Sequence, residues 1–108
     1  MRLLVDESIP EQILPYVAEF EPAVVRREGF KGLRNGVLLR AAVDRGFTVI
    51  FSADQSLRFQ QNLGRIGNGA VVIVNIRNRM KDILPALPRI KSAIAAVRPG
   101  EVIEVFPA

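Results

Sequence analysis

Short apolar runs alternate along the chain with longer stretches of mixed polarity. Three of these runs, at residues 2–5, 47–51 and 70–74, contain at most one polar side chain each. Such runs are typical of strands that are buried on both faces of a sheet. Two weaker strands are predicted at residues 22–25 and 101–106, and the second has the alternating pattern of an edge strand. The hydrophobic pattern therefore predicts five strands.

Helical patterns fill the intervals between these strands. Ser8 and Glu11 have the spacing of a capping box at the start of the first helix. Pro15 removes a backbone donor from that helix and is expected to kink it. The predicted helices span residues 9–20, 35–46, 54–63 and 80–97, the last with interruptions at Pro85 and Pro88.

Strands that alternate with helices indicate an α/β fold with a mostly parallel sheet and right-handed connections. The predicted architecture is a three-layer α/β/α sandwich, in which helices cover both faces of the sheet. The chain has no internal repeat and no linker-like segment, so residues 1–108 are predicted to form a single domain. The longest apolar run, residues 70–74, is far shorter than the roughly 18 residues of a membrane span, and we expect no membrane partner.

Cysteine and histidine are both absent from the sequence. Without cysteine there is neither a disulfide nor a thiolate metal site, which fits a reducing compartment and leads us to expect a cytoplasmic location. Without histidine, serine–histidine and cysteine–histidine catalysis and the usual zinc sites are excluded. Any hydrolytic chemistry must therefore depend on carboxylates.

The net charge of the chain is +4, and arginine supplies most of the positive side chains. Guanidinium groups match the geometry of phosphate, so the charge favours an anionic partner such as nucleic acid, although only weakly.

Candidate catalytic carboxylates follow two of the predicted strands. Asp6 and Glu7 come directly after the first strand, and Asp54 follows the strand at residues 47–51. The carboxyl ends of parallel strands share one edge of the sheet, where ligands bind, so these acids are expected to lie together. Crowded carboxylates repel one another unless a cation separates them, and Mg²⁺ uses one or two carboxylates with water and phosphate. The structural alternative is a solvated turn at Asp6 and Glu7 and an N-cap at Asp54.

Polar residues near these acids are candidates for binding a substrate. Arginine and amide side chains can contact phosphates and bases, but they also commonly coat exposed surfaces, and an asparagine commonly caps a helix. The candidate substrate-binding residues are Arg34, Asn35, Gln55, Ser56 and Arg58.

Three segments of the sequence resemble those of small PIN-like proteins. They are L-L-V-D-E-S-x-P at residues 3–10, G-L-R-N-G-V-L-L-R-A-A at residues 32–42 and S-A-D-Q-S-L-R-F-Q-Q-N-L at residues 52–63. Proteins of this kind are often described as toxin components of toxin–antitoxin systems. The resemblance implies an α/β/α sandwich and, for active members, an Mg²⁺- or Mn²⁺-dependent ribonuclease.

The resemblance also implies roles for single residues. Asp6 matches the first acid of the PIN-like metal site, Glu7 the acid that often follows it, and Asp54 the aspartate of a later motif, T-N-D-x-D-F. These three residues are therefore the expected metal ligands and catalytic residues, with Mg²⁺ or Mn²⁺ as the cofactor.

The sequence departs from the PIN-like pattern in the T-N-D-x-D-F motif and in the middle helix. Ser52 and Ala53 replace the threonine and asparagine of the T-N-D-x-D-F motif, and Ser56 replaces its second aspartate. Asn35 lies where many PIN-like proteins have an acid in a middle helix. Two of the expected carboxylates are therefore missing.

Three functional hypotheses follow from these observations. The first is a metal-dependent ribonuclease, a toxin component with a reduced acidic site, whose partners would be RNA, an antitoxin-like protein and a second copy of the chain. The second is a catalytically inactive PIN-like module that binds nucleic acid or a partner protein. The third is a purely structural interaction protein.

Overall fold

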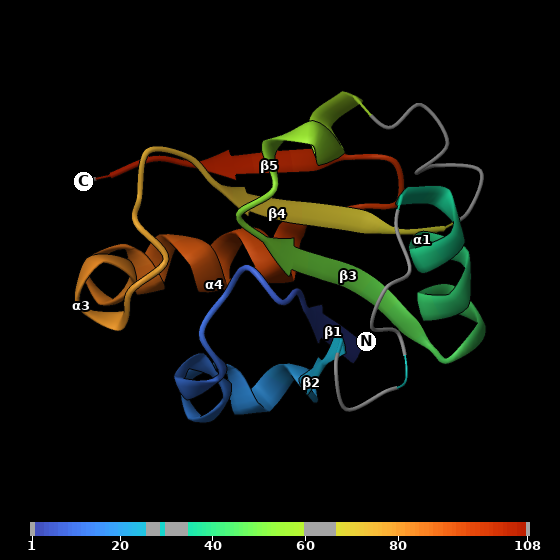
Figure 1. The fold of residues 1–108 in the computed structure, drawn as a ribbon, viewed down its shortest axis with the longest axis horizontal. Coiled ribbons are helices and arrows are strands. Elements are labelled where there is room, and N and C mark those ends of the chain that lie inside the picture. The colour runs from blue at the N-terminus through green and yellow to red at the C-terminus, as the bar shows by residue number, and fades with distance from the viewer. Residues whose placement is uncertain (1, 26–28, 30–34, 60–66, 108) are drawn as a thin grey trace.

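The computed structural model describes residues 2–25, 29, 35–59 and 67–107 and contains a five-stranded sheet (Figure 1). The strands are β1 (Arg2–Val5), β2 (Ala23–Val24), β3 (Phe47–Ser52), β4 (Gly69–Ile73) and β5 (Val102–Val105). Their order in the sheet is β2-β1-β3-β4-β5, and every neighbouring pair is parallel. The predicted α/β class and parallel sheet are thus confirmed, as is the edge position of the last strand.

Helices connect the strands and cover both faces of the sheet. Alternate residues of a strand point to opposite faces, so in β1 Leu3 and Val5 join one apolar cluster and Leu4 joins the other. The first cluster includes residues of the helices η1 (Glu11–Phe20), α3 (Met80–Ile83), η4 (Leu84–Ala86) and α4 (Leu87–Ala96). The second cluster includes residues of the helices α1 (Asn35–Asp44) and η3 (Gln55–Phe59). The described residues therefore form the predicted three layers.

The first helix differs from its prediction. It is a 3-10 helix that starts at Glu11 instead of Ile9, and its N-cap, Pro10, makes no side-chain capping bond. The predicted capping box is therefore wrong, because the Ser8 hydroxyl is hydrogen-bonded to Asp6 and to the backbone N–H of Ala53 instead. The predicted kink is present, since Val17 has non-helical dihedral angles.

The other helices follow their predictions more closely. The last one is interrupted where its prolines lie, giving the short α3 and η4 before α4. The C-terminal glycine of α1, Gly46, has a φ of +88°, as the predicted helix end requires. Asn35, considered in the sequence as a possible helix cap, is the first residue of α1. Of the helix predicted at residues 54–63, the described part is the 3-10 helix η3, and residues 60–63 lie outside the described residues.

Membrane insertion was not expected from the sequence. Among the helices of the described residues, none has the length and apolar character that a membrane span requires.

Candidate functional site

The candidate acids lie at the centre of the sheet, where β1 and β3 are neighbours. β2 lies on one side of β1 and the later strands lie on the other, so the direction of the connections reverses between β1 and β3. Such a switch point is where ligands bind in parallel α/β sheets, outside the carboxyl ends of the strands. The backbone N–H of Asp6 donates to the carbonyl of Phe51 at 2.9 Å. Asp6 and Ser52, the last residue of β3, are therefore side by side at this point.

The side chain of Asp6 accepts hydrogen bonds from two serine hydroxyls. Its Oδ2 lies 2.6 Å from Ser8 Oγ and 2.9 Å from Ser52 Oγ. Each hydroxyl in turn accepts a backbone N–H at 2.9 Å, from Ala53 and Asp54 respectively. Because a hydroxyl has only one proton to donate, these bonds orient both serines toward the carboxylate.

Asp54 caps the helix that follows it. Its Oδ1 accepts the backbone N–H of Ser56 at 2.9 Å, and its carbonyl accepts the N–H of Leu57 at 3.2 Å. The capping role considered for Asp54 in the sequence is therefore confirmed. It involves only one of the two carboxylate oxygens.

Each of the two aspartates retains one oxygen that is not hydrogen-bonded within the described residues. These atoms are Oδ1 of Asp6, a partly buried residue, and Oδ2 of Asp54, an exposed residue. Glu7 is exposed in the turn after β1. Among the described residues, no group of three or more acidic side chains is arranged to hold a metal ion.

The chemistry of these donors can be compared with the needs of a cation. Mg²⁺ prefers oxygen ligands and commonly takes one or two from the protein, with water and phosphate completing its coordination. In number and in chemistry, the two available oxygens of Asp6 and Asp54 match that requirement for one ion. Within the described residues they are not part of a group of three carboxylates.

The predicted substrate-binding residues fall into two groups. Gln55 and Ser56 are exposed and directly follow Asp54, so they lie at the same edge of the sheet. Arg34 and the side chains of Asn35 and Arg58 lie outside the described residues.

The sequence indicates no chemical role for two serines of this site. Ser8 has the spacing of a capping box, and Ser52 differs from the PIN-like motif only as the replacement for a threonine. The contact between Ser8 and Asp6 could have been predicted from the sequence, because an aspartate commonly hydrogen-bonds to the residue two positions later. No local signal exists for Ser52, whose contact with Asp6 depends on the pairing of β1 and β3.

No protein-family model, curated protein or solved structure matches the chain. The resemblance to PIN-like proteins therefore stays a prediction from the sequence.

Proposed function

We propose that the protein is an Mg²⁺- or Mn²⁺-dependent ribonuclease of the PIN-like type, a cytoplasmic toxin component with a reduced acidic site. One observation supports this proposal above the others. The hydroxyl of Ser52 is hydrogen-bonded to both the carboxylate of Asp6 and the backbone N–H of Asp54, so a single side chain connects the two acids at the switch point.

Hydrogen bonds from two serine hydroxyls and from one backbone N–H give each acid a defined orientation. Oδ2 of Asp6 is held by Ser8 and Ser52, and Oδ1 of Asp54 is held by the N–H of Ser56. The remaining oxygens are Oδ1 of Asp6 and Oδ2 of Asp54, and these would hold the ion. When bound, a divalent ion supplies charge neutralisation for phosphodiester oxygens and activation of a water.

Other residues of the edge contribute to substrate binding in this proposal. Gln55 and Ser56 are exposed beside Asp54 and can hydrogen-bond to an RNA strand. Glu7, one residue after Asp6, assists as a further acidic group near the bound ion.

The test is cleavage of a generic single-stranded RNA during a titration with Mn²⁺. Wild-type protein is expected to cut only when the metal is present, and Asp6→Asn and Asp54→Asn are each expected to lose most of this activity. Asp44→Asn is the matched control, because Asp44 is an exposed carboxylate at the end of α1, before the amino end of β3. No metal-dependent cleavage by the wild type, or equal cleavage by all four proteins, would contradict the proposal.

The second candidate is an inactive PIN-like module that binds nucleic acid, an antitoxin-like protein or a second copy of the chain. The observation in its favour is that the described residues contain no three-acid group. In that case RNA binding survives Asp6→Asn and Asp54→Asn, weakens steeply with salt, and is not followed by cleavage.

A further inference from the structure

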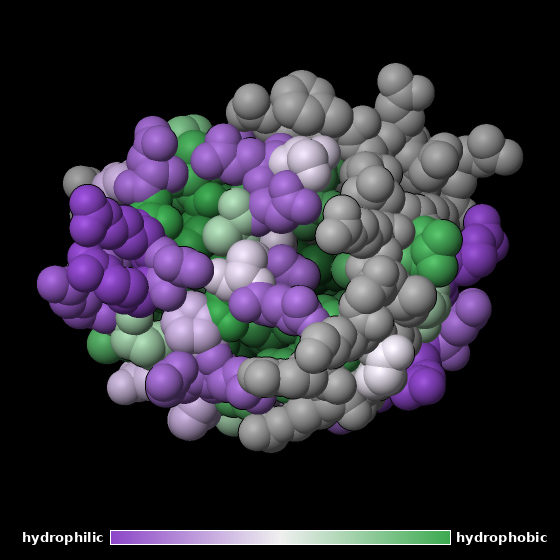
Figure 2. Space-filling model, in the orientation of Figure 1, coloured by the Kyte–Doolittle hydropathy of each residue, from purple (hydrophilic) through white to green (hydrophobic). Residues whose placement is uncertain are grey.

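A second polar feature lies at the same edge of the sheet, beyond the end of β4. It is a cavity of about 340 Å³ lined by Asn75, Ile76, Arg77, Arg79, Asp82 and Pro107. The first four residues belong to the connection from β4 to α3, and Pro107 follows β5. Figure 2 shows hydrophilic side chains gathered at the end of the molecule where α3 lies in Figure 1. A volume of this size is at the lower end of the range for small-molecule sites.

Two arginines give this cavity a positive charge. Arg77 is exposed and makes no hydrogen bond or ion pair with any other described residue. Arg79 donates from Nε to Oδ2 of Asp82 at 2.8 Å, a contact that leaves its two Nη groups for another acceptor. Two arginines against one aspartate leave one net positive charge on the lining.

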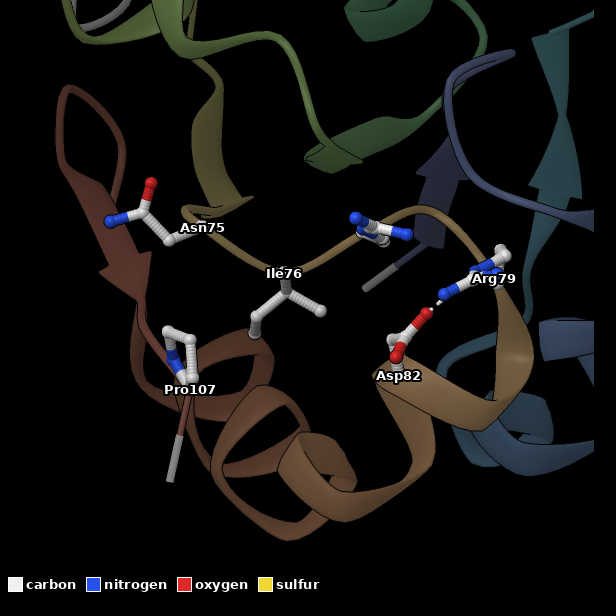
Figure 3. A pocket seen from close by; sticks show the side chains of 6 residues that line it. Asn75, Ile76, Arg79, Asp82 and Pro107 are labelled. Atoms are coloured by element: carbon white, nitrogen blue, oxygen red, sulfur yellow. Dashed lines mark hydrogen bonds and ion pairs between the residues drawn. The ribbon is translucent and has the colours of Figure 1, made fainter.

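The other residues of the lining provide an amide and an apolar wall. Figure 3 shows Asn75 and Pro107 on one side of Ile76, and the Arg79–Asp82 pair on the other. Asn75, which follows the end of β4 and lines the cavity, has a φ of +58°. A ligand with both an anionic group and a flat or apolar part would therefore match the charged side and the apolar side of the cavity.

We propose that the cavity binds a phosphate group of a nucleotide in the RNA strand, with Arg77 and Arg79 as its ligands. Guanidinium groups form two parallel hydrogen bonds to phosphate oxygens, and the wall formed by Ile76 and Pro107 packs against the attached sugar or base. β4 is paired directly with β3, so the cavity and the Asp6–Asp54 site open at the same edge of the sheet. The assignment of RNA as the source of this phosphate rests on the function proposed above.

The experiment titrates adenosine monophosphate into ¹⁵N-labelled protein in the presence of EDTA, so that no divalent ion contributes. Amide shifts are expected at residues 75–82, and adenosine, which retains the sugar and base but has no phosphate, is expected to cause much smaller shifts there. Arg77→Ala should weaken the binding about tenfold, the loss expected for one hydrogen-bonded charge contact. Arg98→Ala is the matched control, because Arg98 is an exposed arginine before β5, at the opposite edge of the sheet. It is expected to bind like the wild type.

The outcomes separate this site from the proposed ribonuclease activity. Localised binding that depends on Arg77, without any RNA cleavage, supports the phosphate site and contradicts the ribonuclease. Metal-dependent RNA cleavage with no amide shifts at residues 75–82 contradicts the phosphate site and supports the ribonuclease. Equal binding of adenosine monophosphate by Arg77→Ala and Arg98→Ala also contradicts the phosphate site, and it leaves the proposed ribonuclease activity unaffected. Equal shifts with adenosine and its monophosphate also overturn the phosphate site, because the phosphate would then not be recognised.

Discussion

The hydroxyl of Ser52 lies 2.9 Å from Oδ2 of Asp6, although 46 positions separate the two residues in the sequence. Ser52 is almost completely buried, with 1% of its surface exposed, and the contact crosses from the end of β3 to the end of β1. The same hydroxyl accepts the N–H of Asp54. Asp6 is thus a structural residue of the carboxyl edge as well as the principal candidate for its chemistry.

Replacing Asp6 by alanine is expected to destabilise the fold by about 2 kcal/mol. The substitution removes the acceptor of both serine hydroxyls and leaves partly buried donors unsatisfied, each at a cost of about 1–3 kcal/mol before relaxation. Asp6→Asn should lower the free energy of unfolding by less, because its amide oxygen can still accept hydrogen bonds from both serine hydroxyls. Urea denaturation of the two variants measures the difference.

Glu7→Ala is the control for this comparison, since Glu7 is exposed and adjacent to Asp6. It should change the free energy of unfolding by less than about 0.5 kcal/mol. Equal stability of Asp6→Ala and Glu7→Ala would show that the serine contacts are not structural.

Ser52→Ala is expected to lower the free energy of unfolding by about 1–2 kcal/mol. It removes the donor to Asp6 and leaves the backbone N–H of Asp54 without its acceptor. Ser56→Ala makes the same chemical change at an exposed position whose backbone N–H, and not its hydroxyl, contacts Asp54. Thermal or urea unfolding should separate the two variants clearly, and a larger loss in Ser56→Ala would be inconsistent with this account.

Gly69→Ala is expected to destabilise the fold by about 1–3 kcal/mol through steric overlap. A Cβ at this position would lie 2.8 Å from the carbonyl oxygen of Arg98 and 3.0 Å from Cγ2 of Val97. A backbone oxygen cannot move without shifting the connection between α4 and β5, so the strain is not easily relieved. A variant as stable as the wild type would mean that this connection is free to shift.

The ion pair between Glu19 and Lys91 predicts a small dependence of stability on pH. Nζ of Lys91 lies 2.7 Å from Oε2 of Glu19, and this hydrogen bond lowers the pKa of the Glu19 carboxyl below its ordinary value. Because the folded-state pKa is lowered, the contribution is complete above the ordinary pKa of glutamate and is lost as the pH falls through the lowered value.

The measurement compares urea midpoints of the wild type and Lys91→Gln. A small difference is expected at neutral pH, and it should vanish in strong acid and shrink in high salt, because both groups are substantially exposed. A difference that persists in acid would show that Lys91 acts through packing and not through charge.

Much of the fold could be predicted because the strands have a simple hydrophobic signature. The runs around Leu4, Ile50 and Val72 are buried on both faces, and every strand was expected within one or two residues of its observed bounds. The first helix was predicted less well. Ser8 and Glu11 have the spacing of a capping box, but the serine hydroxyl has a tertiary partner in Asp6, which a local motif cannot reveal.

The position of the candidate site could also be predicted, but its internal contacts could not. The carboxyl ends of β1 and β3 place Asp6 near Asp54 once the strands are known to be adjacent and parallel. The sequence does not reveal that Ser52 connects the two acids, because that contact depends on the register of strand pairing. The cavity at Asn75 follows β4 at the same edge, but no motif identified it.

A metal site shared by Asp6 and Asp54 is tested most directly by calorimetric titration with Mn²⁺ of the wild type, Asp6→Asn, Asp54→Asn and Asp44→Asn. One bound ion is expected in the wild type and in Asp44→Asn. The affinity of each of the other two variants should be at least about tenfold lower, because each loses a charged ligand. Urea denaturation confirms that Asp6→Asn is folded under the same conditions. No binding by the wild type, or equal affinity in all four proteins, would contradict a metal site shared by Asp6 and Asp54.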